Sequence, residues 1–234
     1  SPHIRTELPG PKARAMIARD AAVISPSYPR DYPFVMSHGR GTEVWDVDGN
    51  RFLDFMAGIA VCATGHAHPA VVKAVQGAAE KFLHISSDYW HEEMVGLGER
   101  LAAVAPLGEP AMSFICQSGT EAVEGALKLA KRYTNRREII SCVNAYHGSS
   151  HGSLSVGGNE IFKRAYRPLL PGTKNVVYGS FQQLDEITEN TAAFIVETVQ
   201  GEAGIMVACS EYFQALRKKC NETGTLLILD EIQA

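Results

Sequence analysis

The stretch that decides the fold is Thr225–Ala234, which reads TLLILDEIQA. Four consecutive leucine and isoleucine residues follow the turn signal Gly224 and Thr225, and they end at Asp230 and Glu231. A short apolar run bounded in this way predicts a buried strand of a parallel sheet. Because ligands of open α/β sheets bind outside the carboxyl ends of the strands, we expect Asp230 to be a functional carboxylate.

Length and composition describe an ordinary globular chain. It has 234 residues, of which 45% are apolar and 21% charged, as in soluble domains with one sizeable core. A net charge of −4 without a basic stripe argues against nucleic-acid binding, and no apolar run approaches the roughly 18 residues of a membrane span. No secretory leader is visible, and widely spaced cysteines without a C-x-x-C pair indicate reduced, mostly buried thiols and a cytoplasmic location. The five cysteines are Cys62, Cys116, Cys142, Cys209 and Cys220.

Residues 1–65 predict an arm, a helix and a hairpin, which we expect to form part of a smaller lobe. A loose helical stripe covers residues 12–24 and ends where the segment Ser25–Pro29 brings two prolines. Asp48-Gly49, flanked by alternating apolar residues within 42–55, is the strongest short-range hairpin signal.

Residues 66–234 predict a larger domain in which strands alternate with helices. Such an alternation builds βαβ units and a mostly parallel sheet flanked by helices, so the predicted fold class is α/β. The predicted helices are Pro69 to about His84, about His91 to Ala105, Gly119–Arg132 and Ser210–Asn221. The predicted strands are Met112–Cys116, Glu138–Val143, Asn175–Tyr178, Ala192–Val196 and Thr225–Leu229, and the predicted glycine-rich loops are 58–66 and 144–158.

The segment Gln117–Ala122 is the first candidate site, because a predicted strand turns there into a predicted helix. The free backbone N–H groups of the first helical turn, together with the helix dipole, form an anion site. The hydroxyls of Ser118 and Thr120 could add donors. The alternative is that either hydroxyl only caps the helix.

The segment Asn144–Gly152 is the second candidate site. Tyr146 and His147 lie beside a glycine after a predicted strand, and an aromatic ring next to an imidazole suits a planar ligand. The alternative is a flexible loop with an incidental Tyr-His pair.

Two histidine pairs raise the question of a metal site, and neither predicts one. His147 and His151 have the helical metal spacing, but the glycines beside them argue against a helix, so we reject a zinc site there. His66 and His68 precede a helix that begins with proline, without an acidic cluster nearby, which favours capping and packing roles.

The third candidate site is the loop that contains Glu197 and Glu202. Two carboxylates five residues apart could form an acid/base pair or belong to a solvated turn. The fourth is the opening stretch itself, whose Asp-Glu ending also occurs in P-loop ATPases. The chain has neither the G-x-x-x-x-G-K-[ST] loop that those enzymes need nor the G-x-G-x-x-G of dinucleotide-binding proteins.

All four candidate sites follow strands of one predicted sheet, where they could converge on a single ligand. A phosphorylated ring with a cationic nitrogen fits the set, with its phosphate on the helix that starts at Gly119, its ring against Tyr146 and its nitrogen on Asp230. Pyridoxal phosphate has this structure, and an acidic partner for its pyridinium nitrogen is part of its usual setting.

These residues resemble the class III aminotransferases, which share fold type I with aspartate aminotransferase. The resemblance implies a small domain to which residues 1–65 contribute, and a large pyridoxal-phosphate-binding domain over residues 66–234 that is incomplete at its C-terminal end. The matching motifs are Ser118–Glu124, Tyr146-His147-Gly148, Glu197–Gly204 and Asp230–Gln233, with Asp46–Asn50, Gly58–Val61 and Gly65–Pro69 upstream.

The resemblance also implies how the matching residues hold the cofactor. Backbone and hydroxyl groups of Ser118, Gly119 and Thr120 would bind the phosphate. Tyr146 would stack on the ring, with His147 beside it.

The remaining roles follow from the same resemblance. Asp230 would pair with the pyridine nitrogen, Gln233 would lie near the phenolic oxygen of the ring, and Glu197 would support the hydrogen bonding around the cofactor. Glu202 resembles an acidic gate that pairs with a substrate-binding arginine, and Ile59 would line the substrate pocket.

Three features depart from the family pattern. The lysine that forms the family's Schiff base follows Asp-Glu-x-Gln by a few tens of residues, past Ala234, so we expect this chain alone not to transaminate. Ser149 stands where many relatives have an arginine that grips a substrate carboxylate. Thr198 replaces the usual proline, a minor change to the loop.

The predicted reaction is the transfer of an amino group from an ω-amino or basic amino acid to an oxo acid. Donors of the 4-aminobutyrate, acetylornithine or ornithine type and 2-oxoglutarate as acceptor are implied by the resemblance, as is a homodimer in which a partner threonine completes the phosphate site. Racemases and a decarboxylating relative share the scaffold, and Ser149 leaves them open because racemisation needs no grip on a second carboxylate. A truncated, non-catalytic chain that binds the cofactor is the alternative of a different class.

Overall fold

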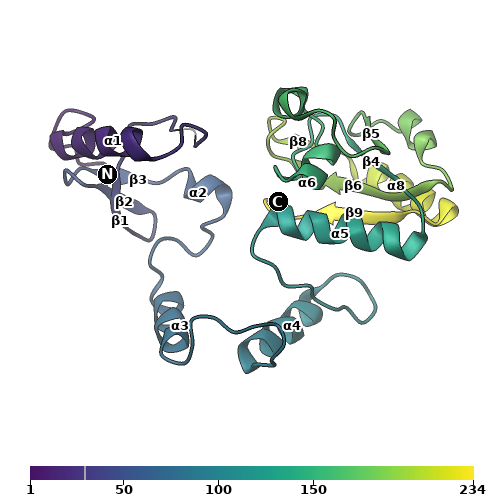
Figure 1. The fold of residues 1–234 in the computed structure, drawn as a ribbon, viewed down its shortest axis with the longest axis horizontal. Coiled ribbons are helices and arrows are strands. Elements are labelled where there is room, and N and C mark those ends of the chain that lie inside the picture. The colour runs from purple at the N-terminus through teal and green to yellow at the C-terminus, as the bar shows by residue number, and fades with distance from the viewer. Residues whose placement is uncertain (29) are drawn as a thin grey trace. The chain divides into compact units, whose positions relative to one another are not determined.

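The computed structural model describes residues 1–28 and 30–234, so Pro29, predicted to help end the first helix, lies outside the described residues. The chain divides into two compact units, an N-terminal unit Ser1–Trp90 and a C-terminal unit His91–Ala234 (Figure 1). This division falls later than the boundary expected after residue 65, and the domain assignment of the complete protein stays a prediction. Over the described residues, no helix is long and apolar enough to cross a membrane.

A four-stranded parallel sheet forms the centre of the C-terminal unit. Its strands lie in the order β5-β4-β6-β9, and each neighbouring pair is parallel. All seven residues of β6 are buried, as expected for a central strand covered on both faces. The strand bounds are β4 Glu138–Cys142, β5 Thr173–Val176, β6 Thr191–Glu197 and β9 Leu226–Asp230.

The helices of the C-terminal unit begin and end at recognisable signals. Ser118 is the N-cap of α5, and Asn135 ends this helix with a left-handed φ of 56°. Gly224 ends α8 in the same way, with a φ of 66°. The helices are α4 Glu92–Val104, α5 Gly119–Thr134, α6 His151–Val156, α7 Glu160–Lys163 and α8 Ser210–Thr223, the 3₁₀ turns are η1 Arg164–Tyr166 and η2 Gln182–Glu186, and a small antiparallel ribbon joins β7 Val199–Gln200 to β8 Met206–Val207.

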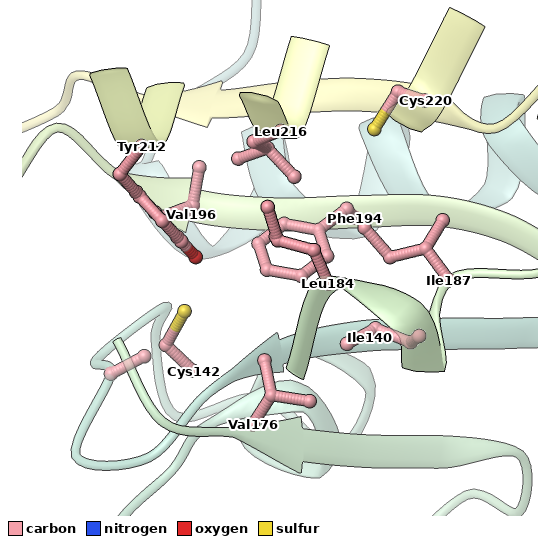
Figure 2. Close-up of a cluster of buried hydrophobic side chains, with 11 residues drawn as sticks. Ile140, Cys142, Val176, Leu184, Ile187, Phe194, Val196, Tyr212, Leu216 and Cys220 are labelled. Carbon is pink, nitrogen blue, oxygen red and sulfur yellow. The ribbon is translucent and has the colours of Figure 1, made fainter. Parts of the chain in front are cut away.

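Alternate side chains of the parallel strands point to opposite faces of the sheet and form two apolar cores. On one face, Ile140 and Phe194 pack with α8 and η2, as Figure 2 shows. On the other face, Ile139 and Ile195 pack with α5 and with Val156 of α6. The sheet is thus sandwiched between helices, which confirms the predicted α/β class.

The N-terminal unit contains the predicted hairpin. Strands β2 and β3 pair antiparallel around Asp48-Gly49, and Gly49 has the positive φ of 83° that this turn requires. The Asp48 carboxylate accepts the N–H groups of Lys12 and Ala13, so the hairpin turn caps the first helix. The elements are α1 Pro11–Val23, β1 Met36–Arg40, β2 Glu43–Asp46, β3 Arg51–Leu53, α2 Ala57–Ala60 and α3 Pro69–Ala79.

Three sequence predictions of local structure are wrong, and the first is the loop 58–66, whose first three residues belong to α2. Met112–Cys116 forms no strand in the described part of the chain, because a strand needs a hydrogen-bonded neighbour and these residues have none. Residues 144–158 are not entirely loop, since α6 lies within them. The N–H groups of Gly152 and Ser153 lie in its first turn, where they have no acceptor within the helix. The Glu124 carboxylate of α5 accepts both, which offsets the cost of a helical glycine.

Candidate cofactor-binding site

Two acidic side chains lie next to each other at the carboxyl ends of β6 and β9. In the register of these parallel strands, Glu197 is the partner of Asp230. The two residues are only 7% and 8% exposed. Buried carboxylates at such close range need hydrogen bonds to remain ionised, and each has its own set.

Asp230 is bonded to His147, which belongs to the loop after β4. Oδ2 of Asp230 lies 2.8 Å from Nδ1 of His147, and Oδ1 accepts the N–H of Ile232 at 3.2 Å. Because an ionised carboxylate only accepts, Nδ1 of His147 is the donor of this pair, and in a neutral imidazole Nε2 is then the acceptor. Nε2 is buried without a hydrogen-bond partner, so it marks a position where a bound group or water would complete the hydrogen bonding.

Glu197 connects two loops at the same end of the sheet. Its carboxylate accepts the N–H of Tyr146 at 3.0 Å and the N–H of Gly201 at 3.1 Å. Burial raises the pKa of Glu197, while these two hydrogen bonds act in the opposite direction. The contacts fix the backbone of Tyr146 to the end of β6.

The N-terminus of α5 lies beside the end of β9. A Cβ atom added to Gly119 would lie only 3.0 Å from Cδ1 of Ile232, two residues after Asp230. A glycine at this position therefore allows the first turn of α5 to lie beside the end of β9, close to the Asp230–His147 pair.

Ser118 and Glu121 together cap this helix end. The Ser118 hydroxyl accepts the N–H of Glu121 at 3.4 Å, and the Glu121 carboxylate accepts the N–H of Gln117 at 2.9 Å. Ser118 therefore caps the helix, one of the two alternatives that its sequence position left open. The amides of Gly119 and Thr120 lie in the first turn, where no intrahelical acceptor exists, and are suited to bind an anion.

The Thr120 hydroxyl belongs to a polar network that the sequence analysis missed. Its Oγ1 lies 2.7 Å from Oγ of Ser150 and 2.6 Å from Oγ of Ser153. Glu124, one helical turn after Thr120, accepts the N–H groups of Gly152 and Ser153 at 2.9 and 3.0 Å. The one signal in the sequence was this spacing, which puts Thr120 and Glu124 on one face of α5.

The negative charge of Glu124 strengthens the hydrogen bonds of this network. Burial alone would raise the pKa of Glu124, but hydrogen bonds from Ser150, Ser153 and Gly152 outweigh it and hold the pKa below its ordinary range. An ionised Glu124 thus anchors the loop after β4 to α5.

The same loop presents the predicted stacking residue. Tyr146 is 41% exposed, its hydroxyl lies 3.2 Å from Oγ of Ser149, and its ring meets the ring of Phe162 edge-on at 5.9 Å between centroids. Gly148 lets the loop approach α5, because its φ is +116° and a Cβ there would lie 2.6 Å from Oγ1 of Thr120.

The other predicted site residues fall in two places. The Gln233 carboxamide lies against Gly201, where a side chain would overlap it. Glu202 is exposed in the turn between β7 and β8. Ile59 belongs to the N-terminal unit, in the short turn α2, where it is 61% exposed and has a φ of +64°. The roles of Gln233, Glu202 and Ile59 stay predictions.

Three of the histidines considered as metal ligands, His66, His68 and His147, have other partners. His66 bonds Asp54 at 2.6 Å, and the His68 ring accepts the N–H of Ala70 at the start of α3. His151 begins α6, and His147 lies outside that helix. Across residues 1–28 and 30–234, no group of three metal-ligating side chains comes together.

The site thus combines a buried carboxylate bonded to an imidazole, free amides at a helix N-terminus, and a half-exposed aromatic ring. These groups fit the pyridinium nitrogen, the phosphate and the ring of pyridoxal phosphate.

Comparison with known proteins identifies the family. Residues 25–234 match the family model "Aminotransferase class-III". The chain belongs to the class III aminotransferases. Members of this family use pyridoxal phosphate and share the fold type I of the predicted architecture.

The relatives of this aminotransferase chain agree on the kind of enzyme. Acetylornithine aminotransferase of Caldanaerobacter subterraneus is 40% identical over 225 residues, covering 93% of this chain and 56% of the relative. The enzyme of the same name from Methanothermobacter thermautotrophicus is 38% identical over 219 residues, covering 93% and 55%. Ornithine aminotransferase of Toxoplasma gondii superposes with a TM-score of 0.88 at 29% identity, covering 95% of this chain and 54% of that structure. The chain spans about half the length of these relatives.

Proposed function

We propose that the complete protein transfers the amino group of acetylornithine, ornithine or a similar ω-amino or basic amino acid to an oxo acid, with 2-oxoglutarate as acceptor. The observation that supports this most is the position of Asp230, buried and bonded to His147 beside the free amides of α5. The choice of donor rests on relatives that are named acetylornithine and ornithine aminotransferases.

Each residue of the site has a definite task in this proposal. Pyridoxal phosphate, when bound, supplies an electron-accepting ring for bond cleavage at the carbon that holds the amino group. Asp230 would hold a proton on the ring nitrogen, and His147 keeps the Asp230 carboxylate in one orientation through the 2.8 Å bond to its Oδ2. The amides of Gly119 and Thr120 would bind the phosphate, and Tyr146 would lie on the ring face.

Three residues bear on how the substrates would be bound. Glu202 is exposed on a turn, where it is accessible to a cationic partner such as an arginine. Ile59 would contribute apolar surface to the substrate pocket. Ser149 bonds the Tyr146 hydroxyl and cannot grip a carboxylate as an arginine would, so the acceptor acid must be held by other residues.

The proposal extends to assembly and location. We infer a cytoplasmic homodimer, in which the partner subunit supplies a threonine to the phosphate site. Light scattering of the complete protein is expected to give twice the mass of one subunit; a monomer that retains activity would contradict the shared site.

Two measurements on the complete protein test the proposed reaction. The absorbance band of the bound cofactor is expected to shift when acetylornithine or ornithine is added, and to return when 2-oxoglutarate is added. Glutamate is expected to form at the same rate as the donor is consumed. Inversion of an amino acid without any dependence on an oxo acid would replace this proposal by the racemase alternative.

A further inference from the structure

Cys62, His66 and Asp54 of the N-terminal unit form a chain of contacts that the proposed function does not use. Sγ of Cys62 lies 3.9 Å from Nδ1 of His66. Nε2 of His66 lies 2.6 Å from Oδ2 of Asp54. A nucleophile beside a base, with the base oriented by a third group, is the arrangement that activates cysteine in enzymes.

Asp54 determines which nitrogen of His66 faces the thiol. Oδ1 of Asp54 accepts the N–H groups of Met56 and Ala57 at 2.8 and 2.9 Å, so its Oδ2 is left for the imidazole. The hydrogen bond from His66, together with these backbone bonds, lowers the pKa of Asp54, which keeps it ionised at neutral pH. An ionised carboxylate can only accept, hence Nε2 of His66 bears a proton, and in the neutral imidazole Nδ1 presents a lone pair to the Cys62 thiol.

The backbone holds His66 in this orientation. Its N–H and C=O exchange two hydrogen bonds with Gly41, at 2.8 and 2.9 Å. The ring occupies the space that a side chain would take at Gly39, since a Cβ there would lie 2.6 Å from Cγ of His66. The imidazole is therefore positioned by the fold as well as by Asp54.

Burial separates Cys62 from Cys142 and Cys220, and Cys116, which is partly exposed like Cys62, donates its thiol to the carbonyl of Ser118 at 3.5 Å. Asp54 and His66 line a largely apolar pocket of about 620 Å³ within the N-terminal unit, and Cys62 is partly exposed. Cys142 and Cys220 are buried in the sheet core, where burial raises their pKa values to about 12 and about 11. Cys209 is exposed and serves as an internal reference.

We propose that Cys62 is a modification site, a nucleophilic thiol that adds to activated alkenes, with His66 as base and Asp54 as the residue that positions the base. The sulfur forms a bond to the β-carbon as the alkene π bond breaks. The thiol proton passes to Nδ1 of His66 and then to the α-carbon of the adduct. No oxidant, leaving group or second reactant is needed.

The first test is labelling of the folded chain with a limiting amount of N-ethylmaleimide, followed by mass mapping of the five cysteine-containing peptides. Cys62 is expected to react about tenfold faster than Cys209, and Cys142 and Cys220 far more slowly than either. The rate ratio is measured within one molecule of wild-type protein, so it does not depend on any variant folding, on the cofactor or on amino transfer.

Variants then test the roles of the two neighbours. Asp54→Asn keeps an acceptor for the N–H groups of Met56 and Ala57 but can donate to Nε2, which moves the ring proton to Nδ1. We expect the labelling rate of Cys62 to fall about tenfold in Asp54→Asn and in His66→Gln. His68→Asn, which retains a capping side chain for α3, is the matched control and should label like wild type.

Nitrogen NMR of the histidine rings supplies a reading that loss of packing would not produce. The Nε2–H form of His66 is expected in wild type and the Nδ1–H form in Asp54→Asn. The proposal is overturned if Cys62 reacts no faster than Cys209, if Asp54→Asn changes the tautomer without changing the labelling rate, or if His68→Asn slows labelling as much as the other two variants.

Discussion

The two units each contain a histidine–aspartate pair, and the pairs use the imidazole in opposite ways. In the C-terminal unit, His147 bonds Asp230 through Nδ1, and the two side chains are 0% and 6% exposed. In the N-terminal unit, His66 bonds Asp54 through Nε2, and the side chains are 21% and 14% exposed. The nitrogen left over is a buried Nε2 without a partner in the first pair, and an Nδ1 that faces a thiol in the second.

The difference shows that a carboxylate does more than attract a histidine. By taking one ring nitrogen, it decides which nitrogen remains as an acceptor and where that acceptor points. Burial then decides the consequence, because a buried unpaired acceptor demands a ligand or water, whereas a partly exposed one can serve as a base. The same pair of residue types thus supports a cofactor site in one unit and a reactive thiol in the other.

The largest expected effect is on the buried pair. Asp230→Asn in the complete protein is expected to lower the rate of amino transfer by about a thousandfold, since an amide cannot stabilise a proton on the ring nitrogen. The measurement is the initial rate of glutamate formation at saturating cofactor. Glu231→Gln, at the exposed neighbouring position, is the control and should remain near the wild-type rate; a rate for Asp230→Asn within tenfold of wild type would remove Asp230 from the reaction.

The second prediction compares how much each histidine contributes to the free energy of unfolding. His147→Ala leaves a cavity and an unpaired buried carboxylate, so we expect it to lower the free energy of unfolding by about 3 kcal/mol. His66→Ala removes a partner from an aspartate that water can reach, and a loss of about 1 kcal/mol is expected. Urea denaturation of the two variants and of wild type measures both values, and a larger loss for His66→Ala would mean that burial does not control the difference.

The fold was largely predictable, because the parallel strands are short apolar runs and the helices have clear caps. The strand predicted at Thr225–Leu229 forms over Leu226–Asp230, and the helix predicted from Gly119 begins there. The prediction of a strand at Met112–Cys116 was wrong, because an apolar sequence alone does not supply a neighbouring strand. Helix α6 was missed because it depends on Glu124, a residue 28 positions from the Gly152 whose N–H it accepts.

The chemistry of the site was predictable only in outline. The strand-end position of Asp230 indicated a functional carboxylate, and a strand-to-helix turn indicated the anion site. The bond between Asp230 and His147 spans 83 residues, and no local pattern reports such a contact. The sequence likewise did not predict that the Thr120 hydroxyl bonds Ser150 and Ser153. Nor did it predict the contacts that join Cys62, His66 and Asp54, because these depend on how the loops fold.

The third prediction tests the packing that positions His66 in the partly exposed pair. Gly39→Ala puts a methyl group 2.6 Å from Cγ of His66, so the ring must move away from its place and the bond to Asp54 must lengthen. We expect the free energy of unfolding to fall by about 1–2 kcal/mol and the Cys62 labelling rate to fall with it. Gly77→Ala is the matched control, because nothing lies within 4 Å of the new methyl group in α3. This control is expected to be neutral or slightly stabilising, by up to about 1 kcal/mol.

The smallest effect is a pH dependence confined to the partly exposed pair, His66 and Asp54. The pKa of Asp54 is lowered from its ordinary value of 3.8, chiefly by the hydrogen bond from His66. A carboxyl whose pKa is lower in the folded state stabilises the fold at pH values above the ordinary pKa, and this contribution disappears as the pH falls through the lowered one. The difference in unfolding free energy between wild type and Asp54→Asn should therefore be constant at neutral pH and shrink below about pH 4. Denaturation curves at a series of pH values measure it, with Asp31→Asn at an exposed position as control. A difference that stays the same down to about pH 2 would show that Asp54 acts through shape rather than charge, which would also weaken its assigned control of the His66 tautomer.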